Sequence, residues 1–378
     1  MRWAFATLML IHGLLHLMGP AKAFGWAELP ELAPVSRTAG LLWLGAAATL
    51  VGTAALVLQA PRIWWIVGLA ALLLSQAAIL TAWSDARVGT LANLVLLLGV
   101  VYGFAAQGPW SFRAEYERRV EAHRPTGTEV SSGRDVPPLT EADLAPLPVP
   151  IRRYLRATGS VGRLVPRAVR TTWRGRIRGG PEEPWMPFTA EQFNVVEPAA
   201  RFFLMDARRS GLPVDVLHAF AGDSATMRVR LLSLLPMVDA AGPEMDQGES
   251  VTLFNDLALL APATLAGPQV LWEPLDERSA RGTYVGGAVP VHAVLHVNEA
   301  GELVDFVSDD RLAASPDGTS FEPRGWSTPV GGYRSFDGLR LLGQGEGRWH
   351  PSDAPDFPYI ELELLSVEHD PGRGSPPD

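Results

Sequence analysis

The chain has 378 residues, 47% of them hydrophobic and 19% charged, so it is too apolar for a disordered protein and long enough for two or three domains. The absence of cysteine excludes disulfides, thiolate metal sites and cysteine nucleophiles. Its net charge of -9 argues against a nucleic-acid partner, because neutralising phosphates needs a basic excess.

The first third of the chain contains four long stretches without a formal charge. They separate Arg2 from Lys22, Arg37 from Arg62, Arg62 from Asp85, and Arg87 from Arg113. Each is as long as the roughly 20 apolar residues that cross the hydrocarbon core of a bilayer. We therefore predict a four-helix transmembrane domain over residues 1–112, with helices at about 3–21, 38–60, 63–83 and 89–107.

Basic residues near the predicted helix ends indicate the orientation. One side carries Arg2, Arg62, Arg113, Arg118, Arg119 and Arg124, and the other carries Lys22, Arg37 and Arg87. Because basic residues favour the cytoplasmic side, both termini are predicted to lie in the cytoplasm. Lys22 is the only lysine among 32 basic residues, a bias that suggests a GC-rich bacterial genome. We predict a multi-pass protein of the bacterial inner membrane with a cytoplasmic C-terminal domain.

The first predicted helix contains a pair of histidines. His12 and His16 stand four residues apart, hence on one helix face, where two imidazoles can share a metal or bind a haem. The structural alternative is that they form hydrogen bonds between helices, together with polar residues of the other helices. Those residues are Ser75, Gln76, Asn93 and, at a boundary, Asp85.

The composition changes after Phe112. Residues 113–150 are charged and then rich in Pro, Gly and Ser, which predicts a linker with a short helical turn near 140–144. Residues 151–370 form a predicted β-rich soluble domain that begins with a short helix closed by Gly159, and residues 371–378 form a predicted disordered tail. Apolar and charged residues alternate in this domain, as over 169–178, and we expect nine or ten mostly antiparallel strands.

One apolar helix interrupts the strands. Ser250 is a predicted cap for a helix that runs to Ala261, with Asp246 and Glu249 near its positive N-terminus. A long sheet and one helix favour an α+β domain, an incomplete β-barrel wrapped on the helix with an apolar concave face. This arrangement resembles the lipoprotein-carrier type of fold.

Several polar clusters are candidate sites. Four acids before the predicted helix are candidate oxygen ligands for a cation, although a solvated capping loop would contain the same residues; they are Asp239, Glu244, Asp246 and Glu249. Candidate catalytic residues are Glu273, Asp309, Asp310 and Arg311, and candidate ligand-binding residues are Trp272, Asn255 and Asp256. A salt bridge at a strand end is the structural alternative for the Asp-Asp-Arg run. The chain lacks the common nucleotide-binding and hydrolase motifs.

The chain resembles an uncharacterised bacterial membrane family with a domain of unknown function. The resemblance rests on motifs spread over nearly the whole chain: His12-Gly13-Leu14-Leu15-His16, Trp83-Ser84-Asp85-Ala86 with Gly89 and Asn93, Ile151-Arg152-Arg153-Tyr154-Leu155, Val238-Asp239-Ala240, Phe254-Asn255-Asp256, Leu271-Trp272-Glu273 and Ser308-Asp309-Asp310-Arg311. It implies no catalytic residue, ligand or cofactor. The helical part is also loosely similar to small four-helix membrane proteins of the DoxX type.

Three hypotheses follow. The first is a membrane-anchored binding protein that holds a lipid or another hydrophobic molecule in the β-rich cup, because an apolar pocket with few polar groups is typical of a binding site. The second is a redox, haem or metal protein that uses His12 and His16. The third is an enzyme with an Asp or Glu site in the soluble domain.

Overall fold

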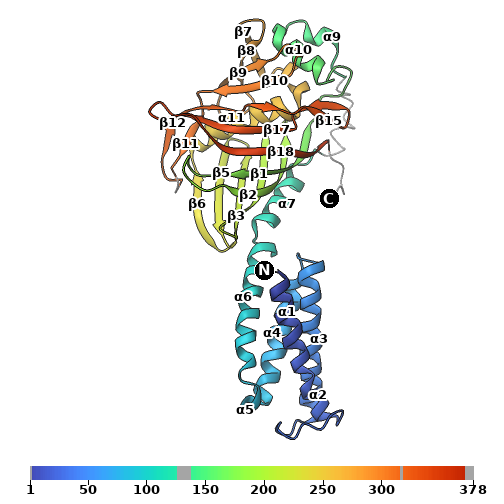
Figure 1. The fold of residues 1–378 in the computed structure, drawn as a ribbon. Coiled ribbons are helices and arrows are strands. Elements are labelled where there is room, and N and C mark those ends of the chain that lie inside the picture. Colours follow the sequence, from blue (N-terminus) through green and yellow to red (C-terminus); the bar gives the residue numbers. More distant parts are fainter. Residues whose placement is uncertain (1, 126–137, 316–317, 371–378) are drawn as a thin grey trace. The chain divides into compact units, whose positions relative to one another are not determined.

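The protein is described by a computed structural model that covers residues 2–125, 138–315 and 318–370. Its contacts divide the chain into two compact units, Met1–Glu115 and Tyr116–Asp378, which Figure 1 draws as a helical part and a β-rich part. Residues 126–137, which are part of the predicted linker, and the predicted tail, residues 371–378, lie outside the described residues.

The first unit is helical. Its helices are α1 (Arg2–His16), α2 (Met18–Ala23), α3 (Arg37–Gln59), α4 (Trp64–Thr81), α5 (Trp83–Ala86) and α6 (Gly89–Gln107). Within the part of the chain that the structure describes, four helical stretches are long and apolar enough to cross a membrane. They are Arg2–Ala23, Arg37–Gln59, Trp64–Thr81 and Gly89–His123, the last of which continues into α7 (Phe112–His123).

A proline explains why the first stretch is two helices. Pro20 has no N–H to donate to the carbonyl of His16, and its ring would clash with that carbonyl. The regular helix α1 therefore ends at His16, and α2 resumes at Met18.

The second unit is dominated by antiparallel strands. The first six strands are β1 (Ala168–Ile177), β2 (Met186–Val195), β3 (Ala200–Arg209), β4 (Leu212–Ala221), β5 (Ser224–Leu231) and β6 (Leu235–Ala241). The later long strands are β7 (Val270–Pro274), β8 (Ser279–Tyr284), β9 (Val291–Val297), β10 (Leu303–Ser308), β17 (Gln344–His350) and β18 (Phe357–His369).

Among the described residues, six short strands lie between β10 and β17, so the expected nine or ten strands were too few. They are β11 (Leu312–Ala314), β12 (Phe321–Pro323), β13 (Gly325–Ser327), β14 (Val330–Gly331), β15 (Arg334–Phe336) and β16 (Leu339–Leu341). Strands of two or three residues are too short to show an alternating pattern, which is why the sequence did not reveal them.

Over the described residues, the main sheet has 14 strands and is not closed. Its order is β6-β5-β4-β3-β2-β1-β18-β17-β13-β10-β9-β8-β7, with β14 paired to β17. Helix α11 (Pro243–Leu260) contacts β5 and β6 at one end of this order and β9 and β10 near the other. The sheet must therefore curl around the helix, as Figure 1 shows. This confirms an open antiparallel sheet with a packed helix.

Helix α11 begins earlier than predicted. Gly242 is its N-cap with a φ of 113°, and Pro243 occupies the first turn, where its missing N–H costs nothing. Ser250 lies inside the helix, donates to the carbonyl of Asp246 and accepts from the N–H of Ala288. The predicted cap at Ser250 is therefore wrong, and Glu249 is a buried mid-helix residue rather than a terminal one.

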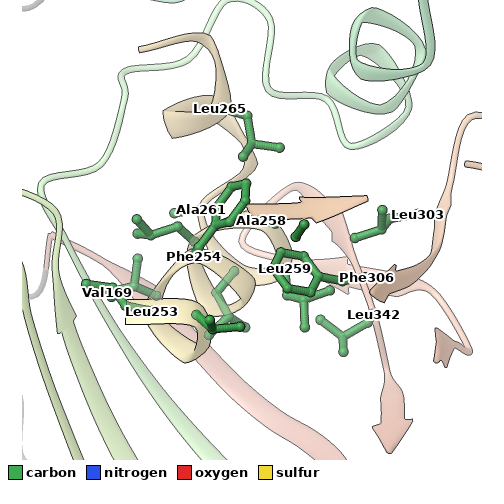
Figure 2. Close-up of a cluster of buried hydrophobic side chains, with 14 of the residues drawn as sticks. Val169, Leu253, Phe254, Ala258, Leu259, Ala261, Leu265, Leu303, Phe306 and Leu342 are labelled. Carbon is green, nitrogen blue, oxygen red and sulfur yellow. The ribbon is translucent and has the colours of Figure 1, made fainter. Parts of the chain in front are cut away.

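Helix α11 is the centre of the hydrophobic core. Phe254 stacks on Tyr284 with ring centroids 5.3 Å apart and contacts Phe306 edge to face at 5.1 Å. Figure 2 shows Phe254 beside Phe306 and the small Ala258. Large and small side chains thus share this core, which is consistent with the close packing of protein interiors.

Residues just before the expected domain start also belong to this core. Leu139, Leu144 and Leu147 are buried in it, on and beside α9 (Glu141–Leu144), within the segment that the sequence assigned to a linker. Helix α10 (Val149–Ala157) follows, and the Tyr154 hydroxyl donates to the carbonyl of Ala258 on α11. The described end of that segment, residues 138–150, thus packs with the β-rich unit.

Candidate ligand cavity and its buried charge network

A cavity of about 760 Å³ lies against α11, and its walls come from strands at both ends of the curled sheet. Strands β1 to β6 contribute one wall, and the residues between Arg311 and Trp349 contribute much of the other. The volume falls within the roughly 300–1,000 Å³ that small-molecule sites occupy.

The sheet register explains the apolar wall. Met205 on β3, Val216 on β4, Val229 on β5 and Val238 on β6 are successive cross-strand partners, and all four line the cavity. Because side chains alternate between the two faces of a strand, this row and its apolar neighbours at a spacing of two, such as Phe203, Val214, Met227 and Leu231, share one face, and His218 marks its polar margin.

Methionine is concentrated on the cavity wall. Each methionine that follows residue 18 in the sequence lines the cavity; these are Met186, Met205, Met227, Met237 and Met245. Methionine has flexible, polarizable side chains that adapt to differently shaped apolar partners. The wall therefore suits a flexible hydrophobic occupant better than one rigid shape.

A buried charge network crosses the cavity floor. Arg201 on β3 donates through Nε to Asp256 at 2.6 Å and through Nη1 to Glu249 at 3.0 Å, both on α11. Gln192 donates to Asp256 at 2.6 Å, and Nδ1 of His218 lies 3.2 Å from Glu249. Each acid thus has a cationic partner and at least one further hydrogen-bonding neighbour.

The electrostatics of the two acids differ. Burial acts to raise the pKa of Glu249, but the charge of Arg201 and the contact with His218 outweigh it, so this pKa lies well below its usual range. For Asp256, burial prevails over the charge of Arg201 and raises the pKa above its usual range. A strongly ionised Glu249 keeps Arg201 charged in the interior, since an isolated buried charge would be very costly.

Arg311 is another arginine of the cavity lining. Nη1 of Arg311 donates to the hydroxyl of Thr252 on α11. Its guanidinium carbon lies 4.4 Å from the ring centroid of Trp326 and 5.8 Å from that of Trp349. Among the described residues, no carboxylate lies within ion-pair distance of it.

The structure separates the candidate residues by their position. Those that line the cavity are Glu244, Glu249, Asn255, Asp256 and Arg311. Those that do not line it are Asp239, Asp246, Trp272, Glu273, Asp309 and Asp310. Glu273 pairs with Arg281 at 3.2 Å on the exposed edge strand β7, and Trp272 donates to the carbonyl of Leu265.

The Asp-Asp-Arg run is not an internal ion pair. Asp310 accepts from the backbone N–H of His292 at 2.6 Å, and its carboxylate lies 2.8 Å from Nδ1 of that ring. Arg311 turns instead to Thr252 and the two tryptophans. Asp310 therefore connects the end of β10 to β9, and Arg311 lines the cavity.

The acids around the start of α11 do not gather around one point. Asp246 accepts from the N–H of Ala225 at 2.6 Å, while Glu249 belongs to the Arg201 network. Within the described part of the chain, no three His, Asp or Glu side chains are placed to hold a metal ion together.

The two helix-one histidines lie in a compact polar cluster of the first unit. Nε2 of His12 is 3.1 Å from both Ser75 Oγ and Asn93 Oδ1, and Ser75 Oγ is 3.0 Å from Nε2 of His16. Asn93 also donates to Gln76 at 3.0 Å. The cluster joins α1, α4 and α6 through hydrogen bonds.

The sequence did not predict three residues of the buried charge network, namely Arg201, Gln192 and Asn194. A signal for Arg201 existed, because it stands two residues before Phe203 and therefore on the same strand face as the apolar Phe203 and Met205. A charged residue at an apolar-face position indicates a buried partner. The contact of Arg311 with Trp326 had no such signal, since a turn-rich segment separates them.

These features define a class of protein: a set of apolar helices joined to an open antiparallel β cup that encloses one helix and a cavity. Residues 137–362 match the model of a family of unknown function, DUF6544, and the chain belongs to this family. The predicted membership of an uncharacterised family is thereby confirmed, over the β-rich part of the chain.

Other comparisons are more distant. No curated protein is similar enough to count as a match. A DUF1329 family protein from Desulfovibrio piger is 12% identical with a TM-score of 0.36, over 60% of this chain and 95% of that chain. A LolA superfamily protein from Nitrosomonas europaea is 10% identical with a TM-score of 0.33, over 58% of this chain and 93% of that chain. Similarities of this size carry no functional argument.

Proposed function

We propose that this protein is a membrane-anchored binding protein that holds a lipid or another hydrophobic molecule in the cavity of its β-rich unit. The observation that carries the proposal is the cavity of about 760 Å³ with an apolar, methionine-rich wall. A cavity this large and this apolar gains free energy from an occupant that removes its surface from water.

The distribution of residues in the first unit supports membrane anchoring. Polar His12, Ser75 and Asn93 are buried between the helices, whereas large apolar side chains point outward; examples of the latter are Leu41, Leu73, Leu98 and Val88. This is the reverse of a water-soluble domain and the arrangement that a bilayer favours. The proposal includes a location in the inner membrane of a bacterium. It also places the β-rich unit in the cytoplasm, which the excess of basic residues at one set of helix ends supports.

The two other hypotheses have less support. Glu273, Asp309 and Asp310 lie outside the cavity, so an enzyme using them would act at an exposed surface. His12 and His16 are engaged with Ser75 and Asn93, which provides a packing role without a cofactor.

Native mass spectrometry of the full chain, gently extracted with its bound lipids, tests the proposal. Val229→Trp places a bulky ring into the cavity from β5, and Thr189→Trp adds the same ring to an exposed position of β2. We expect a lipid or similar adduct on wild type and Thr189→Trp, and its loss from Val229→Trp.

Lipids bound to the helices serve as an internal reference, because neither substitution touches them. A wild-type protein without any adduct, even after incubation with lipid extract, would contradict the proposal. So would an identical adduct pattern in the two tryptophan variants.

A further inference from the structure

Four of the described arginines line the cavity, and Arg311 differs from the other three. Arg201 is paired with Glu249 and Asp256, Arg178 donates to the carbonyls of Pro181 and Pro358, and Arg209 is exposed to solvent.

The guanidinium of Arg311 is placed against the Trp326 ring and hydrogen-bonded to Thr252, so its position is fixed on two sides. A guanidinium has five N–H donors, and only one of them has a partner among the described residues. The remaining donors are available to a ligand.

The acids that line the cavity are already engaged elsewhere or lie at its exposed margin. Glu249 is held by Arg201 and His218, and Asp256 by Arg201 and Gln192. Glu346 pairs with Arg348 at 2.6 Å. The remaining acids of the lining, Glu183 and Glu244, are exposed to solvent.

The charge of Arg311 helps to lower the pKa of Glu249, but Glu249 is paired with Arg201 and not with Arg311. A half-buried cation without an ion-pair partner of its own is energetically unfavourable, because burial removes part of its hydration. An anionic ligand group would offset this cost. Guanidinium matches planar or tetrahedral oxyanions in particular, since two parallel N–H donors reach two oxygens at once. The same cavity has an apolar wall that includes Met205 and Met227.

We propose that the cavity is selective for an amphiphile with an acyl or alkyl chain and a compact oxyanion head, carboxylate or phosphate, which binds Arg311. The chain lies against the methionine-rich wall, and the head lies between α11 and the Trp326 side of the cavity. This inference rests on the proposed binding function and adds the class of ligand. Arg311 is the residue that distinguishes such an amphiphile from a neutral hydrophobe of the same length.

Competitive photo-crosslinking tests the selectivity. The full chain is reconstituted in phosphatidylcholine nanodiscs and labelled with a long-chain alcohol that carries a diazirine, and crosslinked peptides from β3 to β5 are quantified. Unlabelled competitors of the same chain length carry an alcohol, a carboxylate or a phosphate head. Counting only the cavity peptides separates binding in the cavity from partition into the bilayer.

For wild type we expect the acid or the phosphate to compete about tenfold better than the alcohol, as a charge-assisted hydrogen bond would provide. Whichever of the carboxylate and the phosphate competes better identifies the preferred head group of the ligand. Arg311→Gln should abolish this preference but retain labelling by the alcohol, and Arg311→Lys should retain part of it. Arg174→Gln, on an arginine that pairs with Glu363 and does not line the cavity, should behave as wild type.

The outcomes separate the two proposals. Equal competition by acid, phosphate and alcohol at the cavity peptides of wild type would overturn the selectivity and leave the binding function intact. Absence of cavity labelling by the alcohol in wild type would overturn the binding function itself. An unchanged preference in Arg311→Gln would show that another group binds the head.

Discussion

Arg201 on β3 and Glu249 on α11 form an ion pair of 3.0 Å whose side chains are only 8% and 2% exposed. The pair joins the sheet to the helix at the floor of the cavity, and Asp256 extends it along α11. Because both charges are withdrawn from water, the network constrains how the helix is oriented against the strands.

Removing one member of this network should strongly destabilise the β-rich unit. Arg201→Met leaves Glu249 and Asp256 buried without their cation, which costs about 3–5 kcal/mol for a buried pair. Arg174→Met, which breaks the exposed pair with Glu363, should cost no more than about 1 kcal/mol. Denaturant unfolding of the full chain, followed by the loss of β-sheet circular dichroism, measures both, and equal costs would disprove the structural role of Arg201.

The ionisation of Glu249 should appear in the pH dependence of stability. Its pKa is lowered in the folded state, so the unfolded chain takes up the proton first as the pH falls below about 4.3. The stability that the charged form contributes is therefore present at neutral pH and is lost on acidification. Burial shifts the pKa of Asp256 in the opposite direction, and the charge of Glu249 adds to that shift. A comparison with a variant that lacks this charge therefore measures all interactions of ionised Glu249, including its repulsion of Asp256.

Glu249→Gln is the variant for this measurement. The stability difference between wild type and Glu249→Gln should be largest at neutral pH and should shrink below about pH 4.3. Unfolding curves recorded over this range give the difference directly. A stability difference that grows on acidification would mean that the pKa of Glu249 is raised in the folded state instead.

The sequence predicted the architecture better than the site. Long uncharged stretches and alternating strands are local patterns, so the helices of the first unit and an antiparallel sheet around a helix followed from them. Residues such as Arg201 and Arg311 acquire their roles from strands and turns distant in sequence. The start of α11 was misplaced because Ser250 satisfies the local rule for a cap, while its actual partners, Asp246 and Ala288, depend on tertiary packing.

The polar cluster of the first unit should depend most on Ser75. Its hydroxyl contacts His12, His16 and Asn93, so Ser75→Ala removes three contacts and should destabilise the helices by about 1–2 kcal/mol. Thr49→Ala is the control, because the Thr49 hydroxyl donates to the carbonyls of Gly45 and Ala46 on its own helix and, among the residues described, to no other helix. Unfolding of the reconstituted protein in a denaturing detergent compares the two, and an equal cost would mean that the cluster adds no stability between helices.

The same cluster distinguishes packing from cofactor binding. If His12 and His16 only connect helices, purified wild type should contain no stoichiometric metal and show no Soret absorption, even after supplementation. If they ligate a haem or metal, His12→Ala should remove the bound species while the helices remain folded. Metal analysis and visible absorption of the two proteins decide between these roles.

The orientation of the β-rich unit can be tested with reporters at the C-terminus. The excess of basic residues at one set of helix ends, including Arg62 and Arg113, predicts that both termini lie in the cytoplasm. A fluorescent reporter fused after Asp378 should therefore be bright, whereas a phosphatase that is active only outside the cytoplasm should be inactive. Shifting the charge balance with Arg62→Gln and Arg113→Gln should weaken this bias, because these residues lie close to the predicted membrane boundary. Strong phosphatase activity without fluorescence in the wild-type fusion would reverse the topology and place the cavity on the outer side of the membrane, where its occupant would come from the outer leaflet.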